Sequence, residues 1–302
     1  MKTTRLNYGA VEVLDFDITN FTKEDSDNIR ELLLKELIVV IRQQDTNSLN
    51  YARLIHEIGG MANWNQMHTD FDGNSIGGFS EYPNVYEWDK DKFFPIQSVT
   101  GKKSNGKFNG LFPLGKLDWH CNLNGPDRAD GVALQGIKGV DGTQTSWMNT
   151  AIALQEMPAD LYERVKGKYA DFYYNPLNWA DIFNESQRKF MMENRHHYRM
   201  WLEQENAGGV KGIYLYTNND CSINGDDGSL FEELKEYFFQ EKFMYHHDWQ
   251  VGDIVLSDQL LTLHKRRQEV DSVFEQRVLN RITFRLSNVG DPLYIVERNK
   301  IP

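Results

Sequence analysis

Apolar residues recur at two different spacings along the chain, and each spacing predicts its own kind of element. Residues 22–36 place apolar side chains at helical spacing behind Thr22, which can cap a helix. Residues 37–41 form an unbroken apolar run, which predicts a fully buried strand. A shorter helix is expected at 51–58. The N-terminal part therefore begins as helix, strand, helix.

The rest of the chain alternates between strand and helix patterns, apart from one long irregular stretch. Residues 60–115 are rich in Gly, Asn, Asp and aromatic residues and show little periodicity, so we expect functional loops there, forming a lid. Strands at both ends of the chain, with helices packed outside, favour a closed or folded-over sheet. Strands are expected at 116–123, 131–138, 211–216, 253–257, 260–264 and 280–287, and helices at 157–167, 180–204 and 229–239.

Composition supports one domain over residues 1–302. No repeat, low-complexity tract or Gly/Ser linker divides the chain. We expect the lid to interrupt this domain at 60–115 and a helical insertion to interrupt it at about 157–245. No apolar run approaches the ~18 residues of a membrane span, and the N-terminus lacks a signal-peptide core. A cytoplasmic protein without membrane contact is therefore expected.

Charge and cysteine content narrow the function further. The net charge of −11 disfavours nucleic-acid binding. The tight cation cluster Lys265, Arg266 and Arg267 is interpreted as a solvated loop after a strand, in preference to a phosphate site. Cys121 and Cys221 are too few for a disulfide framework or a four-cysteine zinc site. A metal would therefore depend on histidine and oxygen ligands.

Three polar residues could meet at one metal ion. His120 and Asn122 stand two apart in an expected strand, so their side chains would point the same way. His264 follows the expected strand 253–257 much later in the chain. Two ligands from one segment and one from another would leave positions open for a chelating cosubstrate and O₂. The adjacent pairs at 196–197 and 246–247 would diverge and are assigned no role.

An arginine on the last expected strand could supply an anion site. Residues 280–286 alternate between an apolar face and a face that carries Arg281, Thr283 and Arg285. An arginine that points into a cavity needs an anion, and a guanidinium grips a carboxylate in two places. Arg281 therefore suggests a dicarboxylate ligand, whereas Arg285 is expected in a surface salt bridge.

Several segments together resemble the taurine dioxygenase/TfdA-like family of Fe(II)/2-oxoglutarate-dependent oxygenases. No single segment is specific, but their joint occurrence and order are. The segments are Gly-Ala-Val-Glu-Val at 9–13 with the following helix and strand, Trp-His-Cys-Asn at 119–122, Gly-Thr-Gln-Thr-Ser-Trp-Met-Asn at 142–149, Trp-Gln-Val-Gly-Asp at 249–253, His264 and Arg281.

The resemblance implies a fold, a reaction and roles for individual residues. The fold would be mainly β with flanking helices, a double-stranded β-helix or jelly roll. His120 and His264 would bind iron, and Thr145 with Arg281 would hold the distal carboxylate of 2-oxoglutarate. Arg277 rivals Arg281, because the family often has two arginines four apart here. A small-molecule substrate would be hydroxylated with O₂, releasing succinate and CO₂.

Asn122 departs from the family, which places a carboxylate at this position. The amide could still bind iron as a neutral ligand in the catalytic set with His120 and His264. The position could be vacated for water or an anion, as in halogenating relatives. The site could also be inactive, which would leave a small-molecule-binding protein of the same fold. A histidine-based hydrolase is a weaker idea, because no Gly-x-Ser-x-Gly elbow is present.

A second His-x-Asp pair, His68 and Asp70, has the spacing of a metal-binding pair. Its flanks are loop-like, without a preceding apolar strand. It also stands far from Thr145 in the sequence, whereas His120 stands at a spacing that resembles the family's. We therefore expect His68 and Asp70 to contact the substrate, where the family often places such residues.

Overall fold

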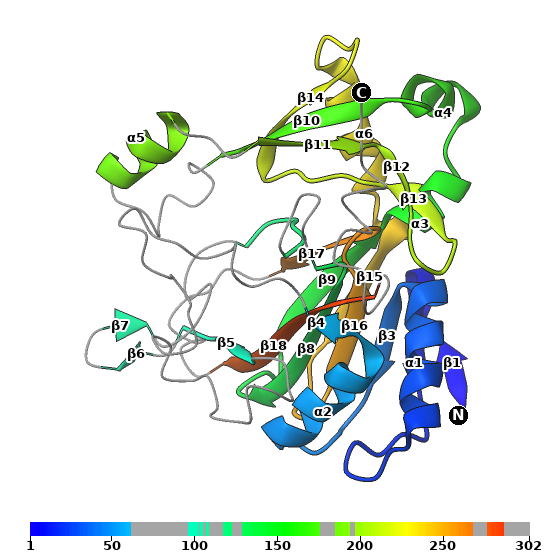
Figure 1. The fold of residues 1–302 in the computed structure, drawn as a ribbon, viewed down its shortest axis with the longest axis vertical. Coiled ribbons are helices and arrows are strands. Elements are labelled where there is room, and N and C mark those ends of the chain that lie inside the picture. Colours follow the sequence, from blue (N-terminus) through cyan, green and yellow to red (C-terminus); the bar gives the residue numbers. More distant parts are fainter. Residues whose placement is uncertain are drawn as a thin grey trace.

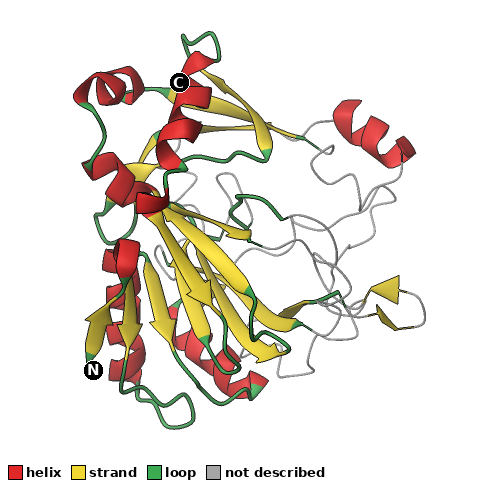
Figure 2. Ribbon diagram, turned by 180° about the vertical axis from the view of Figure 1, so that it is seen from behind, coloured by secondary structure: helices red, strands yellow, loops and turns green. Residues whose placement is uncertain are grey.

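Two β-sheets face each other across a shared core, and helices lie on their outer surfaces (Figures 1 and 2). The computed structural model describes residues 1–61, 96–101, 103–104, 107–108, 117–122, 129–175, 185–193, 197–267 and 277–286. The lid expected at 60–115 falls mostly outside these residues. No helix in the described part of the chain is long and apolar enough to cross a membrane.

The larger sheet joins the N-terminal strands to strands from the middle and the end of the chain. Its order is β1-β2-β3-β16-β8-β18-β4, and β5 also pairs with β18. β2 and β3 run parallel, and the other neighbours are antiparallel. The bounds are β1 Thr3–Arg5, β2 Ala10–Val13, β3 Ile38–Ile41, β4 Gly60–Met61, β5 Gln97–Val99, β8 Gly131–Lys138, β16 Ile254–Asp258 and β18 Val278–Arg285.

The smaller sheet has the order β15-β9-β17, with antiparallel neighbours. β9 covers Gln144–Asn149, β15 covers Met244–Asp248 and β17 covers Thr262–Arg266. His120 pairs with His264 as an isolated antiparallel bridge, so it extends this sheet beyond β17. The strand predicted at 116–123 is therefore wrong, since only this one bridge forms among its described residues.

Two helices cover the outer face of the larger sheet. α1 (Lys23–Glu36) begins at a capping box between Thr22 and Asp25, and α2 (Ser48–Ile58) begins at Asn47. Their buried side chains pack with β3, β16 and β18 into one apolar cluster. α1 ends where Leu37 adopts a left-handed conformation, with φ at 67°. The helices and the buried strand predicted for this part of the chain are confirmed.

The segment 157–245 mixes strands with helices, which corrects the helical insertion expected there. It contains α4 Ala159–Val165, β10 Tyr169–Tyr174, α5 Glu185–Glu193, β11 His197–Trp201, β12 Glu203–Glu205, β13 Lys211–Ile213, β14 Asn219–Ile223, α6 Ser229–Phe238 and a 3₁₀ turn at Glu241–Phe243. The helix predicted at 180–204 is wrong for residues 197–204, because residues 197–201 pair with β10 and 203–204 belong to β12.

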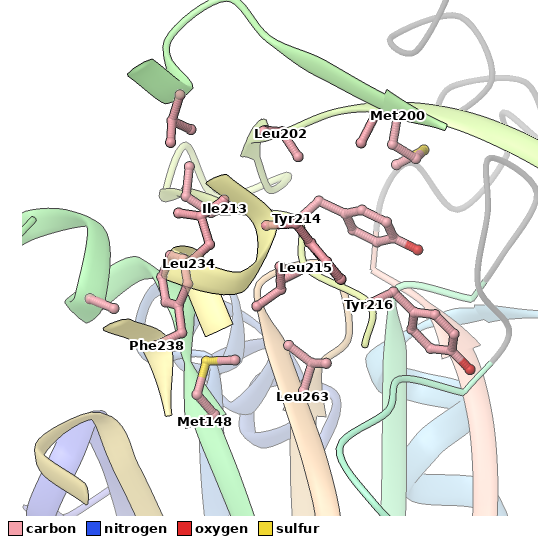
Figure 3. Close-up of a cluster of buried hydrophobic side chains, with 14 of the residues drawn as sticks. Met148, Met200, Leu202, Ile213, Tyr214, Leu215, Tyr216, Leu234, Phe238 and Leu263 are labelled. Carbon is pink, nitrogen blue, oxygen red and sulfur yellow. The ribbon is translucent and has the colours of Figure 1, made fainter. Parts of the chain in front are cut away.

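This segment packs on the outer face of the smaller sheet. Met148 of β9 and Leu263 of β17 point outward from that sheet (Figure 3). They meet Leu234 and Phe238 of α6 and Ile213 of β13 in one buried cluster. α3 (Thr150–Gln155) and a short hairpin of β6 (Lys103–Ser104) and β7 (Lys107–Phe108) complete the described elements. The inner faces of the two sheets are thereby left to form the site.

Candidate functional site

A cavity opens between the two sheets, and both contribute side chains to it. Its described lining combines apolar residues, two histidines, an amide, a hydroxyl and three arginines, without Asp or Glu. The lining residues are Val99, Leu117, His120, Asn122, Leu134, Thr145, His264, Arg266, Arg277, Leu279 and Arg281. Most of the residues selected from the sequence therefore meet at one place.

His120 and His264 lie side by side in this cavity. Their backbones exchange two hydrogen bonds, of 3.0 and 2.9 Å, and their ring centroids are 4.3 Å apart. Nδ1 of His120 lies 2.7 Å from the carbonyl oxygen of Asp118. A carbonyl only accepts, so Nδ1 carries the proton and Nε2 keeps its lone pair when the ring is neutral. The backbone bridge thus brings together two imidazoles that lie far apart in the sequence.

Burial keeps both imidazoles neutral. It lowers the pKa of His120 to about 4. Burial, reinforced by the neighbouring His120, holds the pKa of His264 well below its usual value. Trp147 of β9 stacks on the His264 ring, with centroids 6.2 Å apart. Neutral, oriented imidazoles are the form that binds divalent transition metals.

Asn122 contacts the second histidine and an arginine. Its Nδ2 lies 3.0 Å from Nε2 of His264, and its Oδ1 accepts a hydrogen bond from Nη1 of Arg281. The side chain is buried, and its backbone N–H donates to Gln259. Within the described residues, no three His, Cys, Asp or Glu side chains gather as metal ligands. The polar side chain beside the histidine pair is therefore a neutral amide and not a carboxylate.

Two arginines four apart enter the cavity in different environments. Arg281 donates from Nε over 3.1 Å, and also from Nη2, to Oε1 of Gln97. Arg277 is equally buried, but its Nε has no hydrogen-bond partner. Burial, and then the neighbouring charge of Arg266, lower the pKa of Arg277 to about 9, so it stays charged at neutral pH. Arg277 is thus the arginine that still needs an acceptor.

The interpretation of the cluster 265–267 as a solvated loop is wrong for two of its three residues. Lys265 and Arg266 belong to β17, and Arg266 is buried in the cavity lining. Arg266 follows His264 by two positions, so strand alternation alone places both on one face. Arg285 is also buried, contrary to the surface position expected for it.

Thr145 lies on β9, directly opposite Arg266 in the strand register. Its Oγ1 accepts a hydrogen bond of 2.9 Å from Nε1 of Trp249. Trp249 is fully buried in the core between the sheets. A hydroxyl fixed in this way has its own proton available for a ligand in the cavity.

A buried network holds the turn that leads into β16. Gly252 has φ at +88°, and a Cβ there would lie 2.3 Å from the carbonyl oxygen of Gln44, so only glycine fits. The next residue, Asp253, accepts hydrogen bonds from Arg42 (2.9 Å) and His247 (3.1 Å). These contacts hold the backbone of the turn in place.

Ser146, His246 and Glu241 form a chain of hydrogen bonds, but it does not form a hydrolase site. Nδ1 of His246 lies 2.7 Å from Oγ of Ser146, and its Nε2 lies 2.7 Å from Glu241. Ser146 is fully buried, so its hydroxyl cannot reach a substrate.

His68 and Asp70, the residues expected at the substrate, lie outside the described part of the chain.

Part of the chain is similar to two named dioxygenases. Two curated relatives are the alpha-ketoglutarate-dependent 2,4-dichlorophenoxyacetate dioxygenases of Burkholderia sp. (strain RASC), 29% identical over 150 residues, and Cupriavidus pinatubonensis (strain JMP 134 / LMG 1197), 26% identical over 148 residues. The first match covers 47% of this chain and 48% of the relative, and the second 47% and 50%. The aligned part thus spans about half the length of these relatives.

Solved structures confirm the jelly-roll fold. AAD-2, crystallised with Mn(II) and N-oxalylglycine, matches with a TM-score of 0.69 at 17% identity, over 94% of this chain and 96% of that one. A taurine dioxygenase from Burkholderia xenovorans matches with a TM-score of 0.66 at 17% identity, over 94% and 88%. The family model "Taurine catabolism dioxygenase TauD, TfdA family" matches residues 2–283. The chain therefore belongs to the TauD/TfdA dioxygenase family.

Proposed function

We propose that this protein is an Fe(II)/2-oxoglutarate-dependent oxygenase that hydroxylates a small-molecule substrate. The observation that carries the proposal is the pair of neutral imidazoles, 4.3 Å apart, in a cavity lined by three arginines. Such a cavity suits a divalent metal together with a dianionic chelating ligand. Membership of the family and the relatives' names support the same reaction class.

The donor set at the histidine pair fits iron. His120 would hold the metal through Nε2, because the backbone carbonyl of Asp118 occupies its Nδ1. His264 would supply the second imidazole. Asn122 can contribute at most a neutral amide oxygen, and in this arrangement that oxygen faces Arg281. We propose that two imidazoles provide most of the protein's affinity for iron. Bound iron, O₂ and 2-oxoglutarate would together supply the oxidation, with succinate and CO₂ as co-products.

Arg277 is the better candidate for the distal carboxylate of 2-oxoglutarate. Arg281 was the first choice from the sequence, but its guanidinium is engaged by Gln97 and Asn122 beside the histidine pair. Arg277 has an unpaired Nε in the same cavity. Thr145 would donate its hydroxyl proton to the same carboxylate. We propose that Arg277 and Thr145 hold the far end of the cosubstrate, while Arg281 remains near the metal end.

The protein's own part in the reaction is to position the cosubstrate and to exclude water from the cavity. The apolar residues Val99, Leu134 and Leu279 line the cavity between the charged groups. Together with the buried arginines they orient an anionic cosubstrate in a site of low polarity, where electrostatic contacts are strong.

The decisive experiment is anaerobic addition of Fe(II) and 2-oxoglutarate. Chelation is expected to produce a visible metal-to-ligand charge-transfer absorption, which His120→Ala and His264→Ala abolish. His246→Ala, whose ring lies outside the cavity, serves as the matched control and keeps the absorption. Subsequent admission of O₂ should yield succinate. Stoichiometric iron binding without succinate, in the presence of a substrate screen, would establish a non-catalytic binding protein.

A further inference from the structure

Arg266 is a buried cation to which the family resemblance assigns no role. It lies on β17 two residues after His264, so both side chains share the face that looks into the cavity. Arg266 also lies opposite Thr145 in the antiparallel register of β17 and β9. Directly opposed residues on one face are close neighbours, with Cβ atoms about 4.5–5.5 Å apart.

Arg277 completes a concentration of positive charge at this end of the cavity. The guanidinium charge of Arg266 is near enough to lower the pKa of Arg277. Both side chains are more than nine-tenths buried, and Nε of Arg277 has no partner. No Asp or Glu lies among the described lining residues. Two buried guanidinium groups at one end of a cavity, one of them with an unpartnered N–H, favour an anionic ligand there.

We propose that Arg266 is a second guanidinium for the distal carboxylate of 2-oxoglutarate, so that Arg266, Arg277 and Thr145 hold this carboxylate together. The inference rests on the proposed function and adds a residue that determines cosubstrate specificity. Arg281 does not belong to this group, because Gln97 and Asn122 hold it beside the histidine pair.

The arrangement selects for the length and charge of the cosubstrate. A carboxylate held by two guanidinium groups and a hydroxyl is ionised and has most of its lone pairs satisfied. A 2-oxo acid without a second carboxylate, such as pyruvate, brings no anion to this end of the cavity and leaves Nε of Arg277 without an acceptor. The protein should therefore discriminate strongly between 2-oxoglutarate and pyruvate, and Arg266 should carry part of that discrimination.

The test is calorimetric titration of the Mn(II)-loaded protein with 2-oxoglutarate and, separately, with pyruvate. Arg266→Gln is expected to weaken 2-oxoglutarate binding about tenfold, equivalent to about 1.4 kcal/mol, and to leave pyruvate binding unchanged. Lys265→Gln is the matched control. Lys265 lies on the same strand, with its ammonium 4.5 Å from the Trp119 ring and outside the cavity lining. This control should bind both acids like the wild type.

Other outcomes separate the inference from the proposed function. Wild-type affinity of Arg266→Gln for 2-oxoglutarate overturns the inference and leaves the function standing. Equal weakening of both acids also overturns it, because Arg266 would then support the fold or the metal. Failure of the wild type to bind 2-oxoglutarate overturns the proposed function itself. If Arg266→Gln does not fold, Arg266→Lys replaces it: a selective loss of at least threefold for 2-oxoglutarate supports the inference, and unchanged affinity refutes it.

Discussion

The indole Nε1 of Trp249 donates a 2.9 Å hydrogen bond to Oγ1 of Thr145, from the core into the wall of the cavity. An indole nitrogen can only donate, so the hydroxyl oxygen must accept. The proton of Thr145 is then directed to another acceptor, and a carboxylate in the cavity is the natural one. Trp249 thereby makes the Thr145 hydroxyl a hydrogen-bond donor toward the ligand, without contacting the ligand itself.

Replacing Trp249 by Phe should weaken cosubstrate binding without slowing the reaction. The variant keeps an aromatic ring in the core but no longer fixes Thr145 as a donor. One oriented hydrogen bond contributes about 0.5–1.5 kcal/mol, so the KM for 2-oxoglutarate should rise about three- to tenfold. The kcat should stay within about twofold. Steady-state rates at varied 2-oxoglutarate concentrations measure both constants.

The controls change the hydroxyl itself. Thr145→Ser keeps the donor and should resemble the wild type, whereas Thr145→Val removes it and should raise KM at least as much as Trp249→Phe. A fall in kcat with unchanged KM in Trp249→Phe would show that the indole acts on the reacting centre or the fold, contrary to this interpretation.

Asn122→Asp should strengthen metal binding. The new carboxylate would stand beside Nε2 of His264, where the amide nitrogen now lies 3.0 Å away, and opposite Arg281. An anionic oxygen is a better ligand for a divalent ion than an amide, so the dissociation constant for Mn(II) should fall about tenfold or more, about 1.4 kcal/mol. Titration followed by calorimetry measures the change.

Asn122→Ala shows whether the amide binds the metal at all. If the two imidazoles provide most of the affinity, this variant should bind Mn(II) within about threefold of the wild type. A much larger loss would identify the amide oxygen as a true ligand. Weaker binding in Asn122→Asp would mean that position 122 does not face the ion.

Gln97 should matter for stability through its oxygen and not through its nitrogen. Oε1 accepts two N–H groups of the buried Arg281, whereas Nε2 has no hydrogen-bond partner. Gln97→Leu removes the acceptor and should lower the free energy of unfolding by about 1–3 kcal/mol. Gln97→Glu keeps an acceptor and adds an opposite charge, so it should be at least as stable as the wild type. Urea unfolding measures both, and equal loss in the two variants would contradict the assignment.

Local patterns in the sequence predicted the elements that local forces determine. A few neighbouring residues are enough to recognise the capping box at Thr22 and the apolar run that forms β3. The strand at 197–201 is not, because aromatic residues at helical spacing concealed an alternation that only pairing with β10 makes favourable. The helix prediction was therefore extended to residue 204, because the sequence pattern did not reveal the partner strand β10.

The prediction of the site was also correct where local patterns decide and incomplete where distant residues decide. Alternation along β18 correctly placed Arg281 in the cavity, whereas Arg277 lies just before this strand and a register shift between Val278 and Leu279 separates the two. The choice between them depends on Gln97 and Asn122, which reach Arg281 from other parts of the chain. Arg266 was missed because the cluster was interpreted by its charge. Counting two residues on from His264 in a strand would have placed Arg266 in the cavity, whereas its register with Thr145 could not be derived from the sequence.

The protein should lose stability as the pH falls, and the pH range of this loss depends in part on His247. His247 is fully buried between Tyr245 and Asp253, and burial lowers its pKa below the ordinary 6.5. Below pH 6.5, His247 therefore binds a proton in the unfolded chain but stays neutral in the folded protein until the pH reaches its lowered pKa. The free energy of unfolding falls as pH drops from 6.5 towards the folded pKa, by up to about 1.4 kcal/mol per pH unit for this ring.

His247→Gln isolates this contribution, because Gln is a polar side chain that can donate to Asp253 and does not titrate. Asp258, whose pKa burial raises to about 6, acts in the opposite direction over part of the same window, since its protonated form is favoured in the folded state. Asp258 is common to both proteins, so its effect cancels in their difference. Urea unfolding from pH 7.5 to 5 should show a shallower acid decline for His247→Gln. Parallel curves would mean that His247 is protonated as readily in the folded protein as in the unfolded chain.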